Sequence, residues 1–412
     1  MRGKESHSRA AIVRRRHCRA RQQSGQAIVV GVVFLMVLMG MAALGVDVGV
    51  FRVQQSKLQT VADGAALGGA AEIPYGDVAA GAQNAAALDG FVSGSSGATL
   101  TVNNPPASGP HAGEDQYVEV IATQAQTTMF MKLFGYSSLN LSARAVGYLG
   151  NGPACAYALD PSATGALLVN GSFNIQMQCT VYVDSSSAQA LEANGVGTLS
   201  AQSIGVVGGS LENGSVTVTP EPVSGMVPLS DPLSYLNPPS TSGPCTSPTV
   251  INGSGTATLQ PGVYCSTLII NGSPSVTFQS GTYVFKSGII MNGTPTLTGT
   301  GVTFYNASGG FTLNGSSTSN LSAPTTGPYA GILLFQSRSD SSQVTVNGSN
   351  TSVLNGAIYA ADARIVDNGS GTASTYSILV GDTITINGSA SLNDDYTSLP
   401  AGSPIKAAVL VE

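Results

Sequence analysis

The sequence predicts a membrane-anchored α+β unit followed by an all-β domain, a right-handed parallel β-helix (solenoid). Three observations support this fold class. An uncharged apolar run follows a basic cluster near the N-terminus, residues 98–149 contain stretches of alternating apolar and polar residues, and an Asn-Gly motif recurs from residue 170 to residue 388. A chain of 412 residues is also long enough for two or three domains.

The apolar run extends from Ala27 to Val46. An α-helix needs about 20 residues to cross a bilayer core of about 30 Å, so residues 25–47 are predicted to form a transmembrane helix. The basic cluster in the preceding tail, residues 1–24, includes Arg14, Arg15, Arg16, Arg19 and Arg21. Because positively charged flanks stay in the cytoplasm, we expect a single pass through the inner membrane, with the N-terminus inside and the bulk outside.

Charge is distributed unevenly along the chain. Residues 1–22 carry eight Lys or Arg and one acidic residue, whereas the remaining 390 residues carry eight Lys or Arg and 21 Asp or Glu. The basic end is typical of a topology signal that faces anionic lipid, so the lipid bilayer is an expected partner. The acidic bulk argues against nucleic acid as a partner.

Two kinds of processing would remove this anchor. A signal peptide has an apolar core of about 7–15 residues and an Ala-x-Ala site, and this run is longer and lacks a convincing site. Prepilin-type cleavage after Gly25 would place Glu five residues beyond the cut, where this chain has Val30. We therefore expect a retained anchor.

The helical pattern continues past the membrane to Ile73, and Pro74 ends it. Anchor and extension would form one rod of about 70 Å at 1.5 Å per residue. Gly45-x-x-x-Gly49 and Gly64-x-x-x-Gly68 would permit self-association through the helix, although such spacings also arise by chance in a Gly-rich chain.

A small α+β unit is predicted within residues 48–150. Residues 79–91 are rich in Ala and predict a short helix. Residues 98–103, 117–123 and 139–149 alternate as half-buried strands do.

Several motifs follow one another in this N-terminal part. They are Gly25-Gln26-Ala27 before the apolar run, Ala42-Ala43-Leu44-Gly45-Val46-Asp47 at its end, Leu58-Gln59 with Asp63 beyond it, and then Thr128–Gly135 with Leu139–Val146. Their order over residues 25–150 resembles the TadG-like N-terminal region of Flp (tight-adherence) pilus-assembly proteins. The resemblance implies a pilin-like unit that works with other pilus-assembly proteins. Gly64 departs from the family's usual Ala, which loosens the helix.

Residues 151–412 are predicted to form the β-helix. The best-aligned Asn-Gly turns begin at Asn252, Asn271 and Asn292, and each is followed by a Thr-rich strand, a Gly turn and an aromatic strand. About three short strands per repeat of about 20 residues are typical of a solenoid, with long antiparallel hairpins as the structural alternative. The C-terminal repeats also resemble β-helical regions of pilus-assembly proteins. Residues 219–248 hold eight of the 21 prolines and interrupt the repeat, as a linker or as a loop that crosses the solenoid.

The cysteines agree with the expected topology. Cys18 precedes the anchor, and four cysteines follow it: Cys155, Cys179, Cys245 and Cys265. The pairing that joins sequence neighbours links Cys155 to Cys179 and Cys245 to Cys265. Three connectivities are possible, and free buried thiols are a further alternative.

No residue pattern points to a catalytic, cofactor or metal site. The close acidic pairs of the solenoid are Asp394 with Asp395 and Asp362 with Asp367, which would suit a glycosidase or a calcium site but more often are solvated carboxylates. We therefore expect a non-enzymatic, inner-membrane-anchored component of pilus assembly. A surface adhesin or matrix-binding module is the main alternative, and a carbohydrate-active enzyme is the third.

Overall fold

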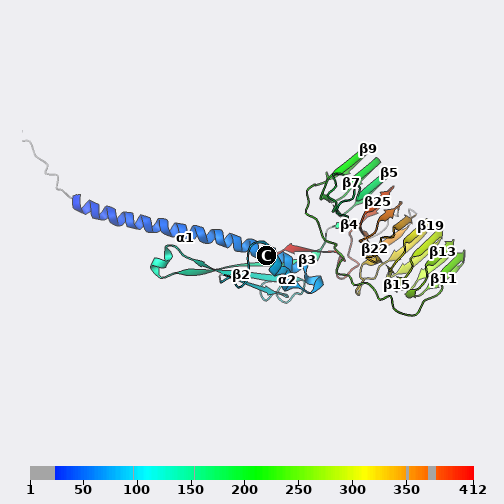
Figure 1. Cartoon of the computed structure of the whole chain (residues 1–412), viewed down its shortest axis with the longest axis horizontal. Coiled ribbons are helices and arrows are strands. Elements are labelled where there is room, and N and C mark those ends of the chain that lie inside the picture. The colour runs from blue at the N-terminus through cyan, green and yellow to red at the C-terminus, as the bar shows by residue number, and fades with distance from the viewer. Residues whose placement is uncertain (1–23, 96, 153, 349–351, 370–376) are drawn as a thin grey trace, which may run out of the picture.

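A computed structural model describes residues 24–95, 97–152, 154–348, 352–369 and 377–412 (Figure 1). A long helix lies beside a small antiparallel sheet, and a β-solenoid follows at the far end of the molecule (Figure 1). Residues 1–23 of the predicted basic tail fall outside the described residues, and with them the topology signal Arg14, Arg15, Arg16, Arg19 and Arg21, whereas Ser24 already begins the first helix.

The first element, α1 (Ser24–Ala71), is one helix of 48 residues, which makes it about 72 Å long. The predicted stop near Pro74 is confirmed, since the helix gives way to the 3-10 turn η1 (Ile73–Tyr75). The N-terminal part of α1 exposes its apolar side chains, and α1 is long and apolar enough to cross a membrane. Beyond the apolar run, one face of α1 is buried by Leu58, Val61, Ala62, Ala65, Ala66 and Ala70.

The small unit places α1 and α2 (Val78–Leu88) against a four-stranded antiparallel sheet. Its strand order is β1 (Thr99–Asn103), β2 (Tyr117–Thr127), β3 (Ser138–Asn151) and β27 (Lys406–Leu410). The 3-10 turn η2 (Met131–Phe134) lies at the tip of the hairpin formed by β2 and β3.

Helix α1 approaches β3 closely and runs along it. Gln55 Nε2 donates to Ser142 O at 2.7 Å, and Gln59 Nε2 donates to Arg144 O at 3.1 Å. A Cβ atom on Gly147 would lie 2.3 Å from Ala66 O, so this contact requires glycine. Both elements therefore advance in the same direction, away from the hairpin tip.

The C-terminal strand corrects the predicted division at residue 151. β27 pairs with β3 from Lys406 opposite Asn151 to Leu410 opposite Gly147. The solenoid is thus inserted between the third and fourth strands of the N-terminal sheet. Residues 406–410 carry an ordinary strand pattern, and such a pattern does not reveal which sheet a strand joins.

The solenoid has about 10 turns built from parallel strands, so the antiparallel-hairpin alternative is wrong. The first of its three sheets contains β12 (Gly262–Tyr264), β15 (Gly281–Phe285), β18 (Val302–Asn306), β20 (Ile332–Gln336), β22 (Val353–Ala360), β24 (Ser377–Gly381), β4 (Ala154–Ala158), β6 (Thr180–Val183) and β8 (Ser203–Val206). The second contains β10 (Val250–Gly253), β13 (Leu268–Gly272), β16 (Ile289–Gly293), β19 (Phe311–Ser322), β21 (Val344–Gly348), β23 (Ile365–Asp367), β25 (Ile384–Asn387), β5 (Leu167–Met177), β7 (Leu191–Ser200) and β9 (Ser210–Thr219). The third contains β11 (Thr256–Leu259), β14 (Ser275–Phe278), β17 (Thr296–Thr300) and the ends of β19 and β22. The short strand β26 (Ala390–Leu392) pairs with β5 of the second sheet.

The turns do not stack in chain order. The chain enters the stack at β4 in its interior and proceeds to one end at β9. It then crosses to the opposite end, begins again at β10 and returns to the interior, where β24 pairs with β4 and β25 with β5. The crossing is made by residues 220–249, which we call the strap.

Asparagines of the Asn-Gly turns form a ladder through the second sheet. In each step the Nδ2 atom of one side chain donates to the Oδ1 atom of the next: Asn213 to Asn194 (2.8 Å), Asn194 to Asn170 (3.3 Å), Asn170 to Asn387 (3.3 Å), Asn387 to Asn368 (2.7 Å), Asn292 to Asn271 (3.1 Å) and Asn271 to Asn252 (2.9 Å). The step from Asn170 to Asn387 spans the place where chain order breaks. The recurring Asn-Gly pair therefore stabilises the stack in two ways. Its backbone forms the tight turn, and its amide side chain bonds to the turns above and below.

Candidate functional site

The hairpin tip, residues 128–137, is fastened to α1 at the end of its apolar run. Asp47 accepts three backbone hydrogen bonds, from Met129 N at 2.9 Å, Phe130 N at 2.9 Å and Met131 N at 2.7 Å. The Asp47 side chain is buried under the tip. Hydrogen bonds to a carboxylate are about twice as strong as those between neutral groups, so this contact holds the tip firmly.

Sequence reasoning placed Asp47 at the membrane boundary but assigned it no contact. One signal for this contact was present in the sequence. Asp47 and Thr128–Gly135 both belong to the motifs of the TadG-like resemblance, and motifs far apart in a sequence often meet in the fold. The structure brings Asp47 into contact with this motif although Asp47 and Met129 are 82 residues apart in the sequence.

The other motif residues lie along the same helix. Gly25, Gln26 and Ala27 are in the first turn of α1. Leu58 is buried against the sheet, and Gln59 Nε2 bonds to Asp63 Oδ1 at 2.7 Å as well as to the β3 backbone. Leu58 and Gln59 therefore fix the helix on the sheet.

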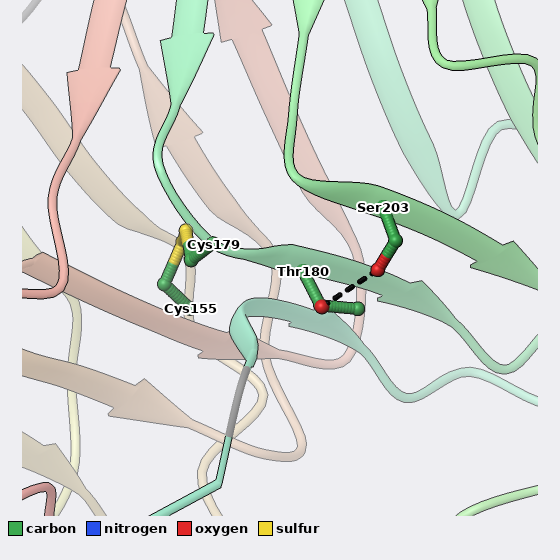
Figure 2. Close-up of a disulfide and its surroundings, with 4 residues drawn as sticks. All are labelled: Cys155, Cys179, Thr180 and Ser203. Atoms are coloured by element: carbon green, nitrogen blue, oxygen red, sulfur yellow. Dashed lines mark hydrogen bonds between the residues drawn. A yellow bond between two sulfur atoms is a disulfide. The ribbon is translucent and has the colours of Figure 1, made fainter.

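Both cysteine pairs expected from sequence proximity lie at disulfide distance in the solenoid. Cys155 of β4 and Cys179, which precedes β6, have Cα atoms 5.8 Å apart (Figure 2). Next to this pair, the hydroxyls of Thr180 and Ser203 are 2.7 Å apart and link β6 to β8 (Figure 2). The pair therefore lies inside the stack and joins two successive turns.

The second pair fastens the strap. Cys245 and Cys265 have Cα atoms 5.4 Å apart. The backbone of Cys245 also forms a parallel β-bridge with Val263 of β12, at one end of the stack. At the opposite end, Val223 of the strap forms a parallel β-bridge with Gly205 of β8. The strap thus runs from one end of the first sheet to the other and pairs with both of its terminal strands.

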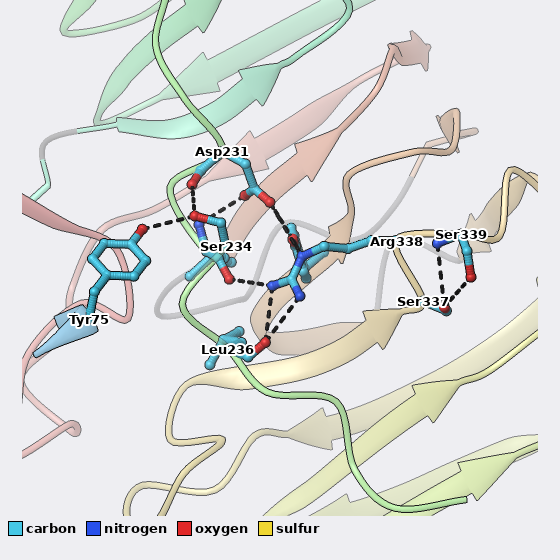
Figure 3. A network of polar contacts seen from close by, with 9 residues as sticks. Tyr75, Asp231, Ser234, Leu236, Ser337, Arg338 and Ser339 are labelled. Carbon is cyan, nitrogen blue, oxygen red and sulfur yellow. Dashed lines mark hydrogen bonds and ion pairs between the residues drawn. The ribbon is translucent and has the colours of Figure 1, made fainter.

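The middle of the strap connects three parts of the chain. Tyr75, beside α1, shares a hydrogen bond of 2.8 Å with Ser234 of the strap (Figure 3). Tyr235 Oη donates to Pro404 O at 2.7 Å, just before β27. On the solenoid side, Arg338 reaches the strap from the segment that follows β20 (Figure 3).

Arg338 makes the most extensive of these contacts. Its guanidinium donates to Leu233 O at 2.7 Å and to Leu236 O at 3.1 Å, and it lies 3.5 Å from Asp231 Oδ2. The same group stacks over Tyr359, 5.2 Å from the ring centre. Tyr359 Oη in turn donates to Asp231. Burial is the larger cause that raises the pKa of Tyr359, and this hydrogen bond is the second. The arrangement is a structural clamp around the strap.

We predict that Arg338→Ala loosens the strap. The carbonyl groups of two buried leucines lose their donor, which corresponds to about 2–4 kcal/mol of local stability. Chymotrypsin, which cleaves after Leu and Tyr, should then cut near Leu233–Leu236 at a protease level that leaves the wild type intact. Arg364→Ala is the matched control, because Arg364 bonds to Thr385 within the solenoid and should leave the strap resistant. An equally resistant Arg338→Ala strap would contradict the clamp.

A cleft of about 1020 Å³ separates the small unit from the solenoid. Its lining includes Tyr75, Tyr157, Tyr182, Asp231 and Lys406. Burial lowers the pKa of Lys406, whose ammonium group donates to Asn151 Oδ1 at 3.2 Å. Tyr75 joins the small unit to the strap through Ser234, whereas Tyr182 and Asp231 hold the strap on the solenoid.

The acidic pairs noted in the sequence occupy different environments. Asp395 Oδ1 accepts a hydrogen bond of 3.1 Å from Thr397 N, as in a turn. Asp367 is buried in β23, whereas Asp362 is exposed. Within the described ranges, no group of three or more His, Cys, Asp or Glu side chains could hold a metal ion.

These features define a class: a candidate membrane-anchored protein in which a long apolar helix and a small sheet carry a β-solenoid. Residues 25–72 match the family described as putative Flp pilus-assembly TadE/G-like proteins, and the matched segment covers nearly all of α1. The match confirms the resemblance over these residues and supports involvement in Flp pilus assembly. No curated protein and no solved structure matches the chain.

Proposed function

We propose that this protein is a non-enzymatic component of Flp pilus assembly, held in the inner membrane by a single pass of α1. The observation that carries the proposal is the family match over residues 25–72, which coincides with a helix that is apolar and exposed in its first half. The second half of the same helix contributes to the core of the small unit, so the anchor continues into the unit as one uninterrupted helix.

The proposed orientation places the sheet and the solenoid outside the cytoplasm. The basic residues before the apolar run support it, because positive flanks remain inside. The two cysteine pairs at disulfide distance also support it, because disulfides persist in oxidising compartments.

We propose other pilus-assembly proteins as partners, and self-association through α1 as a further contact. Of the two Gly-x-x-x-Gly spacings, one is used inside the chain: a Cβ on Gly68 would lie 2.7 Å from Ala85 Cβ of α2. Gly45 and Gly49 have open space around them, so a second helix would approach there.

A clean deletion tests this function with two readouts, pili recovered by shearing and adherence to a surface. The expected result is loss of both, restored by a plasmid copy of the wild-type gene. Normal pili with lost adherence would instead assign the solenoid an adhesive role, for which its polar outward faces would be suited. No change in either readout would contradict a role in pilus assembly.

A further inference from the structure

We propose that the hairpin tip, residues 128–137, inserts its apolar side chains into the extracytoplasmic face of the bilayer that α1 spans. This inference rests on the proposed membrane anchoring. It adds a second membrane contact, on a segment 82 residues away from the helix position to which it is fastened.

The tip exposes large apolar side chains to a degree unusual for a soluble surface. Leu133 is 78% exposed, Phe134 is 70% exposed, and Met129 and Tyr136 are each 58% exposed. Four such side chains within eight residues form a patch, and contiguous apolar patches mark sites of protein or membrane contact.

The position of the tip selects the membrane as its partner. Asp47 binds the tip directly after Val46, the last residue of the apolar run. A run of 20 helical residues rises about 30 Å, the thickness of the bilayer core, so the tip is held at the boundary of that core. The exposed side chains of Leu44, Val46 and Val48 on α1 continue the apolar surface there.

The rest of the hairpin is more polar than its tip. The outer parts of β2 and β3, which connect the tip to the sheet, carry polar side chains such as Gln124, Gln126 and Asn140. Along this hairpin, the large apolar side chains that are exposed are therefore confined to the tip. Tyr136 and the exposed Lys132 suit the interface, where aromatic rings and the long stems of lysines are favoured.

Two attachments would set the orientation of the small unit on the membrane. A single helix can rotate about its axis, whereas a helix with a second inserted point at its side cannot do so freely. Because the unit is joined to the solenoid through the strap and through β27, the tip would also restrict the direction in which the solenoid projects.

The chain contains no tryptophan, so one introduced tryptophan reports its own surroundings. We would place Phe134→Trp in the full-length protein and reconstitute it in phosphatidylethanolamine–phosphatidylglycerol vesicles with brominated acyl chains. Met39→Trp, within the apolar run, is the positive control. Val227→Trp, on the strap and 78% exposed, is the negative control.

The expected result is blue-shifted emission from Phe134→Trp and a loss of intensity of about two-fold in brominated vesicles, as for an aromatic ring at the interface. A Tyr136→Trp variant should behave similarly. Quenching of Met39→Trp without quenching of Phe134→Trp would overturn the tip insertion and leave the anchor in place. A blue shift without quenching would show that protein covers the tip, and unquenched Met39→Trp would overturn the anchoring as well.

Discussion

Asp47→Ala is expected to release the hairpin tip from α1. The amides of Met129, Phe130 and Met131 would lose their acceptor, and each bond to a carboxylate contributes about 1.5–3 kcal/mol. Even a net loss of about 3 kcal/mol corresponds to roughly a hundred-fold in the opening equilibrium. Hydrogen exchange of these three amides, measured on the full-length protein in lipid nanodiscs, should accelerate by at least about that factor.

Two variants make this result specific. Asp47→Asn retains the shape but places an NH2 group where an oxygen accepts, so an intermediate acceleration is expected. Asp63→Ala alters another helix carboxylate, which accepts from Gln59 on its own helix, and should leave the tip amides protected. Unchanged exchange at the tip in Asp47→Ala would mean that its contacts with α1 do not depend on this carboxylate.

The parts of this fold that sequence predicted are those specified by local pattern. α1 follows from an apolar run and an uninterrupted helical stretch before Pro74, and the predicted strands of the small unit correspond to β1, β2 and β3. The solenoid follows from a turn that repeats its Asn-Gly chemistry at each level. Hydrophobic periodicity and turn residues act over a few residues, so they are visible in one sequence.

The parts that sequence did not predict depend on contacts between distant residues. Nothing in residues 406–410 distinguishes a strand of the solenoid from the partner of β3, and the order of turns in the stack follows from which strand edges meet. Arg338 finds its carbonyl partners 102 and 105 residues away. The linked motifs indicated that Asp47 and the hairpin tip meet, but the hydrogen bonds themselves could not be predicted, because the turn that exposes three amide groups is formed only when the hairpin closes.

Glu119→Gln is expected to destabilise the small unit. Glu119 is fully buried and accepts hydrogen bonds from Ser108 Oγ at 2.6 Å, Asn103 Nδ2 at 2.8 Å and Ala107 N at 3.1 Å. Its ion pair with Arg144, at 2.7 Å, joins β2 to β3, and Arg144 also pairs with Glu412 beyond β27. Glu119→Gln removes the charge that pairs with the partly exposed Arg144 and replaces one acceptor oxygen by an NH2 group, so the thermal unfolding midpoint of the detergent-solubilised protein should fall.

The same carboxyl predicts how stability depends on pH. Burial alone would raise the pKa of Glu119, but the hydrogen bonds from Ser108, Arg144, Asn103 and Ala107 outweigh it and lower the pKa from 4.5 to about 2. Because the folded pKa lies below the unfolded one, this stabilisation is present above pH 4.5 and is lost as the pH falls toward 2. Its size is about 3 kcal/mol, at 1.36 kcal/mol for each pKa unit.

Unfolding free energies measured between pH 7 and pH 3 should therefore fall more steeply for the wild type than for Glu119→Gln. Glu114→Gln is the matched control, since Glu114 is half exposed and lies 3.4 Å from His111 in a loop. It should retain the wild-type slope. Equal slopes for the wild type and Glu119→Gln would show that Glu119 does not link the folding of this sheet to protonation, even though it lies at the centre of the polar network that joins β1 and β2 to Glu412 through Arg144.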